Sequence, residues 1–167
     1  MNKYVHILHN FIKDEDCTTL INHLDSLKSN NKLINRGDGR LCIINSKDVL
    51  FTNMVNKYYK KVRSQFNDEY QNISGYILTI YNEGISMAPH IDSEEGEEFG
   101  ALFYLNDDYL GGELVVETPE GKFKHKPKKG TFVYFPSSFE HSVLPVTEGT
   151  RYFFTISLTK DIATQYM

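Results

Sequence analysis

The spacing of the apolar residues changes near residue 72 of this 167-residue chain, and this change restricts the possible folds more than any other feature. Up to that point apolar side chains recur every three or four residues, which is typical of amphipathic helices. Beyond it they occur in short runs with a period of two, separated by turn residues, which is typical of antiparallel sandwiches and barrels. We therefore expect an α+β fold in which N-terminal helices support a β core.

Two amphipathic helices are predicted in the first part of the chain. The first is expected to be capped by Asp14, and its apolar face comprises Cys17, Leu20, Ile21, Leu24 and Leu27. The second follows Asp48, and its apolar stripe comprises Leu50, Met54, Val55, Tyr58, Val62 and Phe66. A glycine-rich loop over residues 35–40 separates the two helices.

The second part of the chain predicts a series of short strands that form a sandwich or barrel, jelly rolls included. These strands are Gly75–Tyr81, Phe99–Leu105, Glu113–Glu117, Lys122–His125, Thr131–Phe135, His141–Val143 and Arg151–Leu158. We expect one domain over residues 1–167, with helical support over about 1–71 and a β core over about 72–160.

Composition excludes several classes of protein. The formal net charge of −4 and a pI near 5.8 give no electrostatic support to nucleic-acid binding. Two cysteines cannot build a disulfide framework, and the N-terminal segment lacks the apolar run and cleavage site of a signal peptide. No stretch has the apolar length needed to span a bilayer. We therefore expect a cytoplasmic protein with no membrane partner.

Three residues have the types and spacing of a metal site. In an extended segment His90 and Asp92 project from the same face, so that an imidazole and a carboxylate can share one ion. Taken alone, such a pair is more often a surface feature. His141, at the start of a later strand, completes a set of two histidines and one carboxylate, which is typical of non-haem Fe(II) oxygenases. Zinc would more often take a cysteine or a third histidine.

A possible anion anchor lies ten residues after His141. In the predicted strand Arg151–Leu158 the odd positions place Arg151 and Thr155 on one face, whereas the even positions form a wholly apolar face. A guanidinium group binds a carboxylate through two parallel hydrogen bonds and stays charged when it is removed from water. The alternative is a surface arginine paired with an acidic residue.

The stretch from Tyr76 to Leu158 resembles the Fe(II)/2-oxoglutarate-dependent dioxygenases, specifically the prolyl 4-hydroxylase group. The matching pieces are Tyr81-Asn-Glu-Gly-Ile-Ser-Met-Ala-Pro-His-Ile-Asp92, Tyr104-Leu-Asn-Asp107, Gly111-Gly-Glu-Leu114, Gly130-Thr-Phe-Val-Tyr-Phe-Pro136, and His141 through Arg151-Tyr152. Arg36-Gly37-Asp38 is also similar to a short motif of the oxygen-sensing animal prolyl hydroxylases.

The resemblance implies a double-stranded β-helix, a distorted jelly roll, with supporting N-terminal helices. It implies Fe(II) held by His90, Asp92 and His141, with 2-oxoglutarate as cosubstrate and O2 as oxidant; we expect ascorbate to support the reaction. It assigns Arg151, with Tyr104 and Thr155, to the distal carboxylate of 2-oxoglutarate, and Tyr81 to a position near the cosubstrate and the metal. Arg36, Asp38 and Arg40 are expected to line the substrate entrance, a plain solvated loop being the alternative.

The resemblance predicts an enzyme that hydroxylates prolyl residues in a peptide or protein and releases succinate and CO2. One alternative is a related oxygenase acting on a free amino acid, a small molecule or a nucleic acid. The nucleic-acid branch carries a second arginine six residues after the cosubstrate arginine, where this chain has Ser157. The other alternative is a non-enzymatic binding module of cupin type. The acidic segment 93–98 is expected to be a solvated loop beside the site.

Overall fold

The computed structural model describes residues 2–44, 47–65, 72–92 and 98–159. Of the acidic segment 93–98, only Glu98 falls among the described residues, as the first position of a strand. Two helices, α1 (Asp14–Ser29) and α2 (Val49–Arg63), accompany the strands. In chain order the strands are β1 (His6–Leu8), β2 (Ile34–Asn35), β3 (Leu41–Ile44), β4 (Asn72–Tyr81), β5 (Met87–His90), β6 (Glu98–Tyr104), β7 (Leu110–Gly111), β8 (Leu114–Thr118), β9 (Gly121–His125), β10 (Phe132–Pro136), β11 (His141–Val143), β12 (Val146–Glu148) and β13 (Arg151–Thr159).

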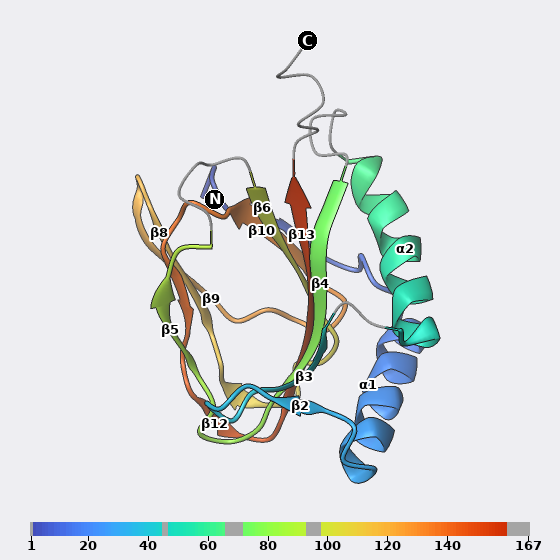
Figure 1. The fold of residues 1–167 in the computed structure, drawn as a ribbon. Coiled ribbons are helices and arrows are strands. Elements are labelled where there is room, and N and C mark those ends of the chain that lie inside the picture. Colours follow the sequence, from blue (N-terminus) through green and yellow to red (C-terminus); the bar gives the residue numbers. More distant parts are fainter. Residues whose placement is uncertain (1, 45–46, 66–71, 93–97, 160–167) are drawn as a thin grey trace.

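Two antiparallel sheets face each other and form the β core. The larger has seven strands in the order β1-β10-β6-β13-β4-β3-β2, and the smaller has four in the order β5-β11-β8-β9. Strands β7 and β12 form a separate short pair. Both helices lie against the outer face of the larger sheet, on the side away from the smaller one (Figure 1). This arrangement confirms the predicted α+β jelly roll.

Alternation along β13 divides the interior into two layers. Phe154, Ile156 and Leu158 pack with the helices, in the same cluster as Leu24 of α1 and Val55 of α2. Phe153 belongs to the second cluster, which lies between the two sheets. Because burying one such side chain contributes about 1.5–3 kcal/mol, this alternation fixes which face of the strand turns toward the smaller sheet. The predicted separation of odd and even positions is confirmed.

The N-terminal part of the chain contributes strands as well as helices, so its description as helical support was incomplete. Strand β1 pairs with β10, and β3 pairs with β4, which extends the larger sheet at both ends. With three and four residues, β1 and β3 are too short to show a clear period of two in the sequence. None of the helices in the described ranges has the length and apolar content needed to cross a bilayer.

Two details of the helices differ from the prediction. Asp14 is the first residue of α1 rather than its cap; Lys13 holds the cap position without a side-chain hydrogen bond. In α2 it is Phe51 that is fully buried, whereas Leu50 is exposed. Phe66, predicted to continue that stripe, lies outside the described residues. At the start of α2, Asp48 accepts a hydrogen bond from the backbone N–H of Phe51 at 2.9 Å, as a capping residue does.

Candidate active site

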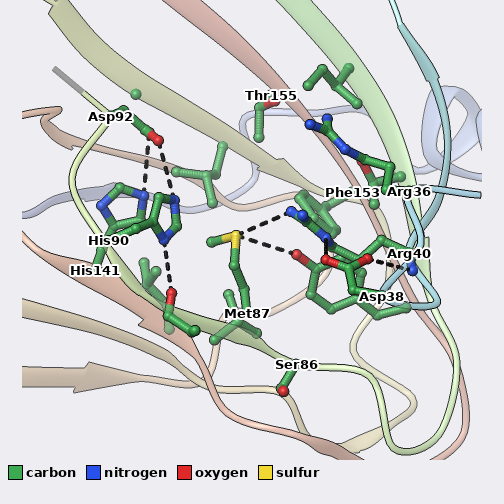
Figure 2. Close-up of a pocket in the computed structure, with 18 of the residues that line it drawn as sticks. Arg36, Asp38, Arg40, Ser86, Met87, His90, Asp92, His141, Phe153 and Thr155 are labelled. Atoms are coloured by element: carbon green, nitrogen blue, oxygen red, sulfur yellow. Dashed lines mark hydrogen bonds and ion pairs between the residues drawn. The ribbon is translucent and has the colours of Figure 1, made fainter.

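Neighbouring strands of the smaller sheet bring His90 and His141 together. Strands β5 and β11 are antiparallel, and their register places His141 opposite His90. Asp92 follows β5, where its backbone N–H donates to the carbonyl of Ser137. One carboxylate oxygen lies 3.2 Å from His90 Nε2 and the other lies 3.3 Å from His141 Nε2. The three groups converge on one point (Figure 2), with their candidate ligand atoms all within 4.8 Å of one another.

Backbone carbonyls fix the orientation of both imidazole rings. His90 Nδ1 donates to the carbonyl of Ala88 at 2.8 Å, and His141 Nδ1 donates to the carbonyl of Phe139 at 2.9 Å. Because a carbonyl only accepts, the proton of each neutral ring is on Nδ1, and the Nε2 lone pair faces Asp92. Histidine ligands of metals are commonly oriented by such a contact through their second nitrogen.

The same contacts shift the pKa values of Asp92 and His141. The hydrogen bond with His141 lowers the pKa of Asp92, although burial opposes the shift. Burial lowers the pKa of His141, but the hydrogen bond to Asp92, the carbonyl of Phe139 and the charge of Asp92 together raise it above its ordinary value. The carboxylate and the imidazoles therefore favour positive charge at the point where they converge.

Arg151, the first residue of β13, is fully buried. Its Nη2 donates to the hydroxyl of Tyr104 at 3.2 Å, whereas Nε and Nη1 have no hydrogen-bond partner among the described residues. Aromatic rings surround the guanidinium, with the centroid of Phe153 at 4.1 Å and those of Tyr81 and Tyr104 at 5.1 Å. A buried guanidinium without an acidic partner is costly, so this arrangement favours the binding of an anion.

A cavity of about 830 Å³ opens between the two sheets. Of the predicted site residues, those that line it are Arg36, Asp38, Arg40, Tyr81, His90, Asp92, His141 and Thr155. Arg151 and Tyr104 are not in its wall: Arg151 contacts the rings of Tyr81 and Phe153, and these rings do line the cavity. Thr155 lies four residues from Arg151 along β13, which corresponds to about 13 Å between the Cα atoms.

The hairpin between β2 and β3 closes one side of the cavity. Arg40 Nε pairs with Asp38 at 2.7 Å, and Arg40 Nη1 contacts the sulfur of Met87 at 3.5 Å. The hydroxyl of Tyr81 contacts the same sulfur at 3.6 Å. Met87 therefore lies between the histidine pair and the hairpin (Figure 2).

Sequence reasoning missed Met87 and Phe153 as components of the site. Met87 begins the strand that ends at His90, and Phe153 shares the polar face of β13 with Arg151. The same alternation that identified Arg151 could have identified Phe153. No pattern in the sequence singles out Met87, because its position follows from the pairing of β5 with β11.

Comparisons with known proteins agree with this geometry. The family model described as "2OG-Fe(II) oxygenase superfamily" matches residues 76–158, about half of the chain. A PKHD-type hydroxylase from Rippkaea orientalis is 38% identical over 88 residues, which is 47% of this chain and 40% of that protein. A PKHD-type hydroxylase from Acaryochloris marina is 34% identical over 87 residues, again 40% of its length. The chain thus matches about two fifths of the length of these curated relatives.

The fold is that of solved oxygenases. A prolyl-4-hydroxylase from Pseudomonas putida superimposes with a TM-score of 0.77 at 15% identity, covering 95% of this chain and 94% of that one. At this identity the likeness concerns the fold alone. Together with the match over the β core and the geometry of the cavity, it leads to one conclusion: the chain belongs to the 2OG-Fe(II) oxygenase superfamily.

Proposed function

We propose that this protein is a 2-oxoglutarate-dependent oxygenase that hydroxylates prolyl residues in a peptide or protein. In the balanced reaction O2, 2-oxoglutarate and a C–H bond of the substrate give the hydroxylated substrate, succinate and CO2. The observation that carries the proposal is one cavity with a His–Asp–His cluster in its wall and a buried, incompletely paired arginine behind that wall.

The chemistry of the cluster fits Fe(II). Two imidazoles and one carboxylate converge, which is the ligand set of non-haem iron oxygenases and would leave coordination positions for ligands from outside the protein. When bound, Fe(II) would react with dioxygen and so provide the oxidising chemistry. The protein's part is to hold His90, Asp92 and His141 in place through the backbone contacts of Ala88, Ser137 and Phe139.

Arg151 is proposed to bind the distal carboxylate of 2-oxoglutarate through its unpaired Nε and Nη1 donors. Tyr104 would add its hydroxyl proton, since Nη2 of Arg151 donates to the oxygen of that hydroxyl. The rings of Tyr81 and Phe153 lie between the guanidinium and the open cavity. We infer that the cosubstrate passes between them and that they exclude water from the ion pair that it forms. Thr155, in the cavity wall, stays a predicted cosubstrate contact.

A peptide or protein substrate is supported by the names of the relatives and by the hairpin at the cavity. A prolyl hydroxylase from Trichoplax adhaerens, solved in complex with a hypoxia inducible factor peptide fragment, has a TM-score of 0.75 at 18% identity, over 95% of this chain and 84% of that one. Arg36, Asp38 and Arg40 line the cavity and are proposed to contact the substrate. A reduced, cytoplasmic location stays a prediction, supported by Cys17 and Cys42, which are both buried and free of disulfides.

Turnover of a peptide library, read by mass spectrometry, tests the proposal. Protein supplied with Fe(II), 2-oxoglutarate, O2 and ascorbate should add one oxygen atom to proline-containing peptides. Matched peptides with alanine in place of proline, and the His141→Ala variant, should show no gain. Oxygen addition to non-prolyl peptides, or to free amino acids alone, would assign a different substrate. The absence of succinate with every substrate would favour the binding-module alternative.

A further inference from the structure

Tyr109 has a buried hydroxyl that the fold itself does not use. The side chain is 3% exposed, and its hydroxyl has no hydrogen-bond partner among the described residues. Buried tyrosine hydroxyls usually have a partner, because an unsatisfied polar group in the interior costs about 1–3 kcal/mol. Nothing in the sequence motifs assigned a role to this residue.

The ring of Tyr109 is held firmly in its position. Lys126 Nζ donates to the carbonyls of Tyr109 at 2.6 Å and of Gly111 at 2.8 Å, and it lies 3.8 Å from the centroid of the Tyr109 ring. A Cβ atom on Gly149 would lie 3.3 Å from both Cα and Cβ of Tyr109. These contacts therefore fix the position of the Tyr109 ring.

Gly112 places Tyr109 beside Arg151. A Cβ atom on Gly112 would lie 3.0 Å from Cε2 of Tyr109 and 3.3 Å from Cδ of Arg151, so both side chains pack against the bare backbone of this glycine. Burial raises the pKa of Tyr109, whereas the charge of Arg151 and a weak side-chain hydrogen-bonding contact with it act in the opposite direction, so the two groups lie close together. The hydroxyl therefore stays protonated and able to donate near neutral pH.

The unsatisfied polar atoms of the interior concentrate at this place. The buried side-chain atoms without a partner in the described part of the chain are Tyr109 Oη, Arg151 Nε, Arg151 Nη1 and His125 Nε2. The guanidinium atoms can only donate, and a tyrosine hydroxyl donates one proton. Donors that converge without an acceptor suit a carboxylate, whose two oxygens accept about four hydrogen bonds.

We propose that Tyr109 donates a hydrogen bond to the distal carboxylate of 2-oxoglutarate, as a third anchor beside Arg151 and Tyr104. This inference rests on the proposed function and adds a cosubstrate-binding residue to it. It also gives a reason for the Gly111-Gly112 pair: Gly112 lets the tyrosine and the arginine approach the same space.

The Tyr109→Phe variant tests this inference by direct binding. Binding is measured by calorimetry on the Fe(II)-loaded protein without oxygen, with 2-oxoglutarate and with 2-oxopentanoate, which has a methyl group in place of the distal carboxylate. We expect the variant to bind 2-oxoglutarate roughly 10- to 100-fold more weakly, the usual effect of losing a hydrogen bond to a charged group. Its affinity for 2-oxopentanoate should not change.

A second readout separates binding from structural support. Because the hydroxyl makes no well-formed hydrogen bond with the described residues, its removal should leave the thermal midpoint of the ligand-free protein unchanged or slightly higher. An unchanged affinity for 2-oxoglutarate, or an equal loss for both ligands, would overturn the role of Tyr109. The Arg151→Met variant keeps the two proposals apart: if it too binds 2-oxoglutarate as the wild type does, the proposed cosubstrate site itself is wrong.

Discussion

Arg151 donates to the hydroxyl of Tyr104 at 3.2 Å, and both side chains are completely removed from solvent. Burial raises the pKa of Tyr104 to about 12, with the charge of Arg151 opposing the rise. The tyrosine is therefore neutral and does not balance the positive charge. The positive charge of Arg151 is therefore buried without a balancing negative charge from this pair. An anionic group of the proposed cosubstrate would supply that negative charge.

Replacement of Arg151 by methionine should separate stability from binding. The variant removes a buried charge whose Nε and Nη1 have no partner among the residues that the structure describes, so the thermal midpoint of the ligand-free protein should stay the same or rise. Its affinity for 2-oxoglutarate should fall by at least about 100-fold, because a bidentate charge-assisted interaction is lost. Differential scanning fluorimetry and calorimetry measure the two effects. A large loss of stability without any loss of affinity would contradict the anchor role.

His141→Ala should abolish turnover and weaken metal binding by at least about 100-fold while leaving the fold largely intact. Loss of a group that merely hydrogen-bonds to a metal ligand already lowers metal affinity by about 10- to 100-fold, and loss of the ligand itself should cost more. His6→Ala offers a matched control, because His6 is exposed on β1 and stacks on Tyr134 outside the cavity. Titration with Mn(II) reports affinity, and circular dichroism reports the fold. Metal binding equal to that of the wild type in His141→Ala would refute the ligand assignment.

Asp16 links the two helices and should make their stability depend on pH. Its Oδ2 accepts from the hydroxyl of Tyr58 at 2.5 Å and from Lys57 Nζ at 2.6 Å. Burial raises its pKa, but these hydrogen bonds outweigh burial and bring the pKa below 3.8. Because the folded-state pKa is depressed, the stabilisation is fully present above the unfolded pKa and is lost as the pH falls through the folded one.

Asp16→Asn should therefore lower the free energy of unfolding by about 1–3 kcal/mol at pH 7. Urea denaturation at pH 7 and at roughly pH 3 should show that this difference shrinks in acid. Asp14→Asn is the matched control, because the Asp14 side chain is 86% exposed and its substitution should change stability by less than about 0.5 kcal/mol. A difference for Asp16→Asn that grows in acid would contradict the assignment.

Gly112→Ala should destabilise the protein by about 1–3 kcal/mol, because its φ of +67° is strained for alanine and the new methyl group would press on Tyr109, Val146 and Arg151. The Gly37→Ala variant separates the effect of backbone strain from the effect of the new side-chain contacts. Its φ is +82°, but nothing lies within 4 Å of the added atom, so only the backbone term remains. Equal effects of the two substitutions on stability and on 2-oxoglutarate affinity would show that the contacts of Gly112 contribute nothing.

Arg36→Ala should raise the KM for a peptide substrate without changing the affinity for 2-oxoglutarate. Arg36 lines the cavity from the β2–β3 hairpin, whereas the proposed cosubstrate anchor, Arg151, lies behind the rings of Tyr81 and Phe153. Lys60→Ala, on the outer helix α2, serves as the control for loss of one positive charge. Steady-state kinetics with a peptide identified in the library measure the effect. A weakened 2-oxoglutarate affinity with an unchanged peptide KM would exclude the substrate-side role.

The β core could be predicted because its signals are local. The bounds of β11 match the prediction, and the alternation along β13 identified its apolar face, which packs with the helices in the structure. The helical pattern that follows Asp48 located the start of α2, whereas the capping role of Asp48 was seen only in the structure. In each case residues near one another in sequence determine the result, and the period of the apolar positions carries the information.

The remainder depended on contacts between distant parts of the chain. Strand β1 forms by pairing with the edge of β10, and the sequence of His6–Leu8 alone does not predict that pairing. The guanidinium of Arg151 was expected to line the cavity. In the structure it lies behind the ring of Phe153, which does line the cavity. Tyr109 reaches the same place through a tight turn and the packing of Gly112, which only the folded chain reveals.

Formation of succinate from 2-oxoglutarate tests the central claim most directly. The wild-type protein, supplied with Fe(II), O2 and a prolyl peptide, should produce succinate in step with oxygen addition to the peptide. His141→Ala and Arg151→Met should lose this reaction at 2-oxoglutarate concentrations that saturate the wild type, and His6→Ala should retain it. Undiminished succinate formation by Arg151→Met, or none by the wild type with any peptide, would contradict the account.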